Sequence, residues 1–229
     1  MSRDLYAAYS GAAAAWRHLE VVANNVANAN TDGFREARVS FKLADGPVAD
    51  SPLQGAFAQV GDITYSGVDG ALVQDGVSTH LALRGEGFFT LADGTYTRDG
   101  KFHLDTDGQL VTQDGTPVQT DAGPVRLQLG ERLVVDAQGL VSGTATGEIG
   151  RLRVVQLDGL QALGSNRWSG TPSNTTNFTV MQGARETSNA DPMRGMVELL
   201  EASRFFEAQQ KAMQASDEMR SRLNRIQGG

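Results

Sequence analysis

The stretch LYAAYSGAAAAWRHLEVVANNVANA, residues 5–29, decides how this chain begins to fold. Its apolar side chains recur at alternating steps of three and four residues, which is the spacing of a heptad seam on one face of a helix. The seam residues are Leu5, Ala8, Ala12, Ala15, Leu19, Val22, Val26 and Ala29. The polar run NTDG at 30–33 then supplies residues that end a helix. The pattern predicts one helix over about residues 4–28.

This seam is rich in alanine. Alanine buries little area per residue, so a lone helix of this kind is marginal in water. Small side chains do allow a second helix to approach closely. Two interpretations follow: the segment is a core helix of one globular domain, or it becomes stable on joining neighbouring helices.

The middle of the chain has the composition of an all-β domain. Asp-Gly pairs, a tight-turn signal, occur at residues 45, 69, 75, 93, 99, 107, 114 and 158. Short alternating segments between them predict strands at 79–83, 88–91, 101–104, 109–112, 125–129, 133–135 and 152–157. We expect an antiparallel, barrel-like or sandwich-like domain over residues 79–187. Pro47, Pro52 and several glycines make 34–78 an expected extended connector.

A second helix is predicted at the other end of the chain. Asp191 and Pro192 stand where a cap and a first-turn proline are favoured. Helical spacing of apolar residues continues from Met193 to Ile226, and Gly228 ends it. The predicted fold class is α+β. Its two terminal helices, in a helical domain of residues 1–33 plus 188–229, pair as a coiled-coil-like layer around the β domain.

Charge and composition exclude several classes of protein. A net charge of −7 opposes binding to nucleic acid. The chain has no cysteine, so disulfides and thiolate metal sites are excluded. No apolar run approaches the roughly 20 residues of a membrane helix. Because Arg17, His18 and Glu20 interrupt the first apolar stretch, we expect export, if it occurs, without a cleaved signal.

No set of residues matches a catalytic or cofactor site. The phosphate-loop candidate from Gly94 to Lys101 has a gap one residue too long and lacks the magnesium-binding hydroxyl. The calcium-loop candidate at Asp105 lacks the required glycine and glutamate. The three histidines are far apart in sequence: His18, His80 and His103. The sequence predicts a protein that is not an enzyme and binds no cofactor, metal or small-molecule substrate.

Three motifs resemble the flagellar rod and hook protein family. They are VANNVANANTDGF at 22–34, RGEGFFTLADGTYTRDGKFHLDTDGQLVTQDGTPV at 84–118 and SNADPMRGMVELLEASRFFEAQQKAMQASDEM at 188–219. The motifs lie in the order expected for the family. Within it, the short length and the segment EASRFFEAQQKAM are closer to the proximal-rod than to the distal-rod protein. The segment 84–118 is similar to both, so a distal-rod subunit is the alternative within the family.

The resemblance implies a structural subunit of the flagellar basal-body rod. Such a subunit is exported by the flagellar type III apparatus, assembles helically in the periplasm with itself and other rod proteins, and passes torque to the hook. A chain without disulfides suits export in the unfolded state. The alternative from another class is a secreted or surface β-domain module that binds glycan or calcium.

The resemblance and the two apolar patterns together define a candidate assembly interface. The asparagine cluster 24, 25, 28 and 30 is expected to bond between helices or to the turn, or else merely to end the helix. The complete candidate set is Leu5, Ala8, Ala12, Ala15, Leu19, Val22, Asn24, Asn25, Val26, Asn28, Ala29, Asn30, Gly33, Phe34, Met196, Leu199, Leu200, Phe206, Met213, Met219, Leu223 and Ile226.

Overall fold

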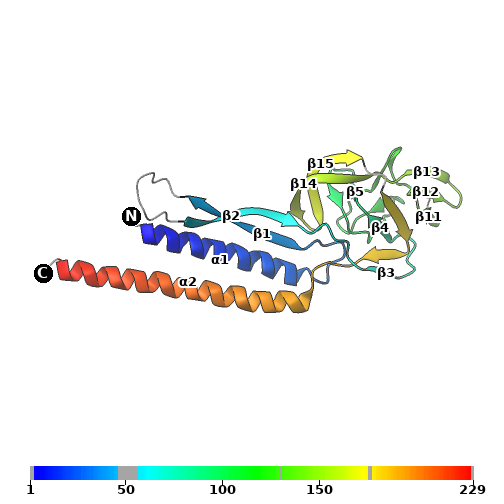
Figure 1. Ribbon diagram of the computed structural model, residues 1–229. Coiled ribbons are helices and arrows are strands. Elements are labelled where there is room, and N and C mark those ends of the chain that lie inside the picture. Colours follow the sequence, from blue (N-terminus) through cyan, green and yellow to red (C-terminus); the bar gives the residue numbers. More distant parts are fainter. Residues whose placement is uncertain (1–2, 46–55, 129, 175–176, 228–229) are drawn as a thin grey trace. The chain divides into compact units, whose positions relative to one another are not determined.

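The computed structural model describes residues 3–45, 56–128, 130–174 and 177–227 (Figure 1). The chain divides into two compact units. Unit 1 consists of Met1–Ala27, Ala37–Ser66 and Asp191–Gly229. Unit 2 consists of Asn28–Glu36 and Gly67–Ala190. The sequence predicted three parts in place of these two units: terminal helices, a connector and a β domain.

Two helices and one β-hairpin form the described part of unit 1. Helix α1 spans Arg3–Ala27 and helix α2 spans Pro192–Gln227. Both helices were predicted from the sequence, and each predicted end lies within one residue of the observed end. Strands β1 (Ala37–Asp45) and β2 (Ala56–Tyr65) pair antiparallel. Residues 34–78, interpreted as an extended connector, therefore contribute a hairpin that packs on α1.

Helix α1 lies between α2 and the β1–β2 hairpin (Figure 1). The rings of Trp16 and Phe206 are 5.4 Å apart between their centroids. Closer to the start of α2, a Cβ atom added to Gly195 would lie only 2.7 Å from Val26 Cγ2. Since late residues of α1 meet early residues of α2, the two helices run antiparallel.

The start of α2 is capped as the sequence predicted. Asp191 Oδ1 accepts the backbone N–H of Met193 at 2.9 Å and that of Arg194 at 3.2 Å. These bonds satisfy two of the N–H groups that every helix leaves unpaired at its first turn. Pro192 follows, where its missing N–H is tolerated. Within the described ranges, neither helix is long and apolar enough to cross a membrane.

Unit 2 is built from short antiparallel strands. Four of them, in the order β14-β15-β6-β5, close into a barrel. The remaining strands form two- and three-stranded sheets. The strands of unit 2 are β3 (Leu72–Gln74), β4 (Leu81–Gly85), β5 (Phe88–Thr90), β6 (Tyr96–Thr97), β7 (His103–Leu104), β8 (Leu110–Val111), β9 (Gln119–Thr120), β10 (Gly123–Pro124), β11 (Leu133–Val135), β12 (Leu140–Gly143), β13 (Gly147–Arg151), β14 (Val154–Gly164), β15 (Arg167–Asn174), β16 (Phe178–Gln182) and β17 (Ala184–Glu186).

One hydrophobic core holds these strands together. Phe89 and Phe102 meet edge to face at its centre, with ring centroids 5.2 Å apart. Edge-to-face packing is a favoured arrangement of aromatic rings. Around them lie buried aliphatic side chains, among them Leu81, Leu83, Leu91, Leu110, Val118, Val125, Leu133, Val141 and Leu152.

The observed fold is mostly β with one helix near each end, which agrees with the predicted α+β class. The strand expected at 133–135 is present as β11. The strand expected at 125–129 is absent from its described residues, 125–128, apart from a single bridge at Arg126. The backbone of Val125 bonds to Leu110 and to Val118, and these bonds go to two different segments, so no continuous ladder forms.

Candidate assembly interface

The predicted residues of α1 line a buried face. Ala12, Ala15 and Val22 are buried, and Leu19 and Val26 are half-buried. The contact of Val26 with Gly195 places this face toward α2. The side chains of Leu5 and Ala8 lie outside the described residues. Much of the predicted seam is thus already covered by α2 within a single chain.

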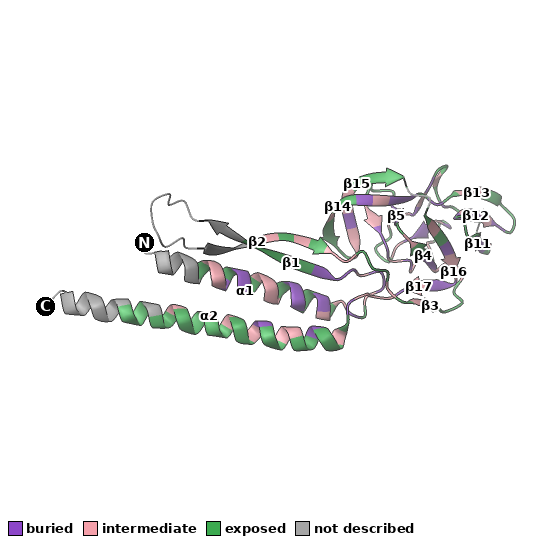
Figure 2. Cartoon of the chain, viewed as in Figure 1, coloured by how far each residue is buried: buried purple, intermediate pink, exposed green. Residues whose placement is uncertain are grey.

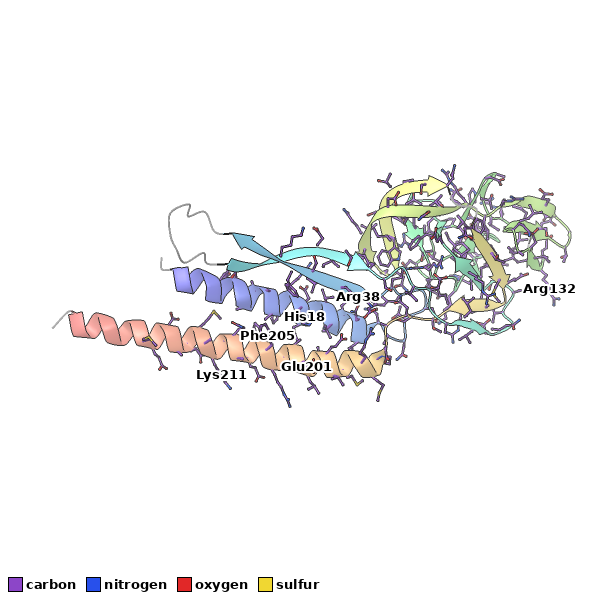
Figure 3. All side chains as sticks on the ribbon, in the orientation of Figure 1. His18, Arg38, Arg132, Glu201, Phe205 and Lys211 are labelled. Carbon is purple, nitrogen blue, oxygen red and sulfur yellow. The ribbon has the colours of Figure 1, made fainter. Side chains whose placement is uncertain are left out.

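Burial on α1 also extends to a second face, which the heptad pattern did not include. Ala14, Val21 and Asn25 are buried, and the His18 ring meets the Phe41 ring of β1 at a centroid distance of 6.0 Å (Figure 3). These residues belong to the face that the hairpin covers. Two partners for one helix explain why α1 is buried over a wider arc than a coiled-coil seam requires.

Asn25 joins α1 to the hairpin through its amide. Its Nδ2 donates to the carbonyl of Ala37 at 2.8 Å, and its Oδ1 accepts the N–H of Ala37 at 2.9 Å. Both backbone groups at the start of β1 are thereby satisfied by one buried side chain. The other members of the asparagine cluster are less enclosed. Asn24 and Asn30 are exposed, and Asn28 Oδ1 accepts the Thr31 hydroxyl at 3.2 Å.

On α2 the predicted residues fall into two groups. Leu199, Phe206 and Met213 are half-buried. They continue a series that includes the buried Gly195 and Ala202, at steps of four and three residues. Sequence reasoning missed these two small residues because it followed large apolar side chains. The spacing of four and three residues around Leu199 and Phe206 would have identified both of them.

The second group on α2 is exposed. Met196, Leu200 and Met219 are more than half exposed, as are Met193 and Val197 beside them. Figure 2 shows α2 exposed over much of its described surface, and Figure 3 shows Phe205, Glu201 and Lys211 on this helix. Leu223 and Ile226 have side chains outside the described residues. Exposed apolar side chains that cluster on one helix are typical of surfaces that meet a partner.

The segment that follows α1 belongs to unit 2. Ala29 is buried, Phe34 is half-buried, and Gly33 has a φ of 69°. A Cβ atom at Gly33 would lie 2.5 Å from the backbone nitrogen of Asp99. This position therefore needs glycine both for its left-handed backbone and for close approach to the next segment. The predicted interface residues 29, 33 and 34 all belong to unit 2.

A buried arginine ties this region together. Arg98 is fully enclosed, and its Nε donates to Glu186 Oε2 at 2.7 Å. Its Nη2 donates to Asp69 Oδ1 and to the carbonyl of Gly85, both at 2.7 Å, and its Nη1 donates to the carbonyl of Gly87. A buried guanidinium must have such partners, because an unpaired buried charge is strongly unfavourable.

Asp32 and Arg35 connect the segment after α1 to this arginine cluster. The Asp32 carboxylate lies 2.6 Å from Lys101 Nζ and 2.5 Å from Arg185 Nη1. Arg35 Nη2 donates to Asp69 Oδ1 at 3.1 Å. Burial lowers the pKa of Arg35, and the nearby charge of Arg98 lowers it further. Sequence reasoning missed these pairs because they join residues far apart in the chain.

The residues tested for chemistry have structural partners. Lys101, of the phosphate-loop candidate, pairs with Asp32. Asp105 Oδ1 accepts the N–H groups of Asp107 and Gln109, which closes the turn between β7 and β8. His80 Nδ1 lies 2.7 Å from Asp75 Oδ2. Among the described residues, no three histidines or carboxylates gather in a way that could hold a metal ion.

Three regions of the chain match families of known proteins. Residues 5–35 match the family described as flagella basal body rod protein. Residues 82–143 match the D1 domain of the flagellar hook protein FlgE/F/G, and residues 181–226 match the C-terminal part of the flagellar basal body rod FlgEFG protein. The chain is therefore of the flagellar rod and hook class, as the three sequence motifs indicated.

Full-length relatives narrow this class. The chain is 33% identical to the flagellar basal-body rod protein FlgG of Bacillus subtilis, over 97% of this chain and 98% of the relative. It is 34% identical to FlgF of Caulobacter vibrioides, over 99% and 98%. FlgF of Salmonella typhimurium is 28% identical over 99% and 98%. The chain belongs to the flagellar basal-body rod protein family.

Proposed function

We propose that this protein is a non-enzymatic subunit of the flagellar basal-body rod that assembles helically through α1 and α2 and passes torque to the hook. The observation that carries the proposal is the apolar surface that unit 1 leaves exposed. Met193, Leu200, Tyr9 and Trp16 are each more than half exposed on the two helices. A partner that covers these side chains gains the hydrophobic free energy of their burial.

The arginine cluster supports a mechanical role for unit 2. Three segments lead into or out of unit 2: 32–35, 67–70 and 184–190. Each of them is hydrogen-bonded to the other two within unit 2. Gly33 N–H donates to the carbonyl of Glu186 at 2.8 Å, and Gly70 N–H donates to Glu186 Oε1 at 2.9 Å. Asn189 Nδ2 donates to the carbonyl of Val68 at 2.7 Å. Force on any of these segments would be shared by the others.

We place the subunit in the proximal rod, after export by the flagellar type III apparatus. The short length of the chain and the segment EASRFFEAQQKAM support a place in the proximal rod.

Basal bodies purified from cells that carry an epitope-tagged copy of the chain test the proposal. We expect the tagged chain to copurify with the rod, and we expect cells without it to lose swimming. Cross-linking to neighbouring subunits then distinguishes a proximal from a distal position. Normal swimming without the chain, or a tagged chain absent from basal bodies, would overturn the proposal. A rise in melting temperature with calcium or glycan would favour the binding-module alternative.

A further inference from the structure

Unit 1 exposes two apolar patches of different chemistry. The aromatic patch consists of Tyr9 and Trp16 on α1, which are 70% and 54% exposed. They are seven residues apart and therefore share one face of the helix. The methionine patch consists of Met193, Met196, Val197 and Leu200 at the start of α2, which are 53–74% exposed.

The two patches lie at different levels of the antiparallel helix pair. Trp16 is level with Phe206, whereas Gly195, on the buried face of α2 between Met193 and Met196 in sequence, is level with Val26. At about 1.5 Å per residue, Tyr9 and Met193 are separated by roughly 30 Å along the helices, and Trp16 and Leu200 by roughly 9 Å. Within one chain the two patches therefore do not lie opposite each other.

We propose that the methionine patch of one copy packs on the aromatic patch of a second copy. This inference rests on the proposed function and specifies the surface through which copies join. Methionine side chains are flexible and make favourable sulfur contacts at the edges of aromatic rings. The two patches differ from each other, so their contact is head to tail. Repetition of a head-to-tail contact builds an open helical assembly when the rotation does not close.

Ion pairs within each helix lie beside both patches. Arg17 Nη1 lies 2.6 Å from Glu20 Oε2 next to the aromatic patch. Arg194 Nε lies 3.5 Å from Glu198 Oε1 next to the methionine patch. Each of these two ion pairs carries no net charge, so the paired side chains themselves add no repulsion between the patches.

The size of the patches indicates how assembly proceeds. Each patch exposes on the order of 300 Å², so one contact between them buries on the order of 600 Å². Stable protein pairs usually bury about 1,200–2,000 Å² in total. A single contact of this kind is too small to hold two free copies together. We therefore expect the chain to be monomeric in dilute solution and to add to a growing rod, where several contacts act at once.

Site-directed disulfide cross-linking tests the patch contact, because the natural chain has no cysteine. One set of cells carries Tyr9→Cys, a second carries Met193→Cys, a third expresses both variants together, and a fourth carries both substitutions in one chain. Intact basal bodies are oxidised and their proteins separated without reductant. We expect linked dimers from the mixture, a ladder of dimers, trimers and longer species from the doubly substituted chain, and neither product from the single variants.

Matched controls separate this inference from the proposed function. Lys211→Cys, an exposed position on α2 outside both patches, should give no link when combined with Tyr9→Cys. A variant that copurifies with basal bodies and supports swimming, yet gives no ladder, would overturn the patch contact and leave the rod assignment standing. Self-linking of either single variant, dimers without longer species, or a link to a different protein would also overturn it. A chain absent from basal bodies would instead overturn the proposed function.

Discussion

Arg98 Nε lies 2.7 Å from Glu186 Oε2, and both side chains are buried in unit 2. Arg98 follows β6 and Glu186 ends β17, so the pair joins two segments that are 88 residues apart in sequence. The same arginine bonds to Asp69 and to the loop between β4 and β5. One side chain thus fixes several connecting segments, and its removal has consequences for all of them.

Arg98→Met should lower the free energy of unfolding of unit 2 by about 3–5 kcal/mol, because it leaves Glu186 buried without its partner. Denaturant unfolding of the purified protein, followed by the fluorescence of the buried Trp168, measures the change. Arg132→Met is the matched control, since Arg132 is exposed (Figure 3). We expect that control to change stability by less than about 0.5 kcal/mol. Equal effects of the two substitutions would show that the cluster contributes nothing specific.

Gly33→Ala should destabilise unit 2 more than Gly115→Ala. Both glycines have a positive φ, 69° and 80°, so each substitution carries a backbone penalty of about 1 kcal/mol. At Gly115 an added Cβ would meet no atom within 4 Å, whereas at Gly33 it would lie 2.5 Å from Asp99 N. The clash adds about 1–3 kcal/mol at Gly33 alone. Thermal unfolding of both variants gives the difference, and a difference near zero would contradict close packing at Gly33.

Glu131→Gln should reduce stability at neutral pH and lose this effect in acid. Hydrogen bonds from the hydroxyl and N–H of Thr146 lower the pKa of Glu131 from 4.5 to about 2. The stabilisation by the ionised carboxylate is complete above pH 4.5 and disappears as the pH falls toward 2. Melting temperatures of the two proteins should therefore converge over this range. A difference that stays constant with pH would show that the carboxylate charge is not involved.

The helices were predictable from the sequence because their signals are local. The spacing of Ala12, Ala15 and Val22 fixes one face of α1, and Asp191 marks the start of α2. The β1–β2 hairpin was not predicted. Pro47 and Pro52, which follow β1 in the sequence, favoured an extended connector, although the Asp-Gly pair at residue 45 is a turn signal.

The contacts that organise the candidate site are of long range, and a single sequence gives no signal for them. Asp32 is a helix terminator by its local pattern, yet in the structure it pairs with Arg185 from β17. Asn25 resembles any polar residue near a helix end, but it bonds to Ala37 in β1. In both cases the local pattern accounts for part of the residue's role, and the partner depends on how the chain folds back.

Ala15→Glu should destabilise the free chain, whereas Ala13→Glu should leave the free chain stable and impair assembly. Ala15 is 2% exposed within the monomer, so a glutamate there must either lose its solvation or push α1 away from its neighbours. We expect several kcal/mol of destabilisation of unit 1, seen as rapid proteolysis of α1 in the purified protein. Ala13 is exposed, and glutamate is a good helix former, so Ala13→Glu should leave the free chain unchanged.

Ala13 lies between Tyr9 and Trp16 in the series of exposed residues at steps of four and three, so its face is the one that carries the aromatic patch. If a second copy covers this face in the rod, Ala13→Glu places a charge in an apolar contact and swimming is lost although the monomer is stable. Swimming assays and proteolysis of the purified variants give both readouts from the same strains. Normal swimming of Ala13→Glu cells would show that this face of α1 stays in solvent. An Ala15→Glu monomer as resistant to protease as the parent chain would show that α2 and the hairpin do not enclose Ala15 in the free protein, and the burial of this face would then have to come from assembly.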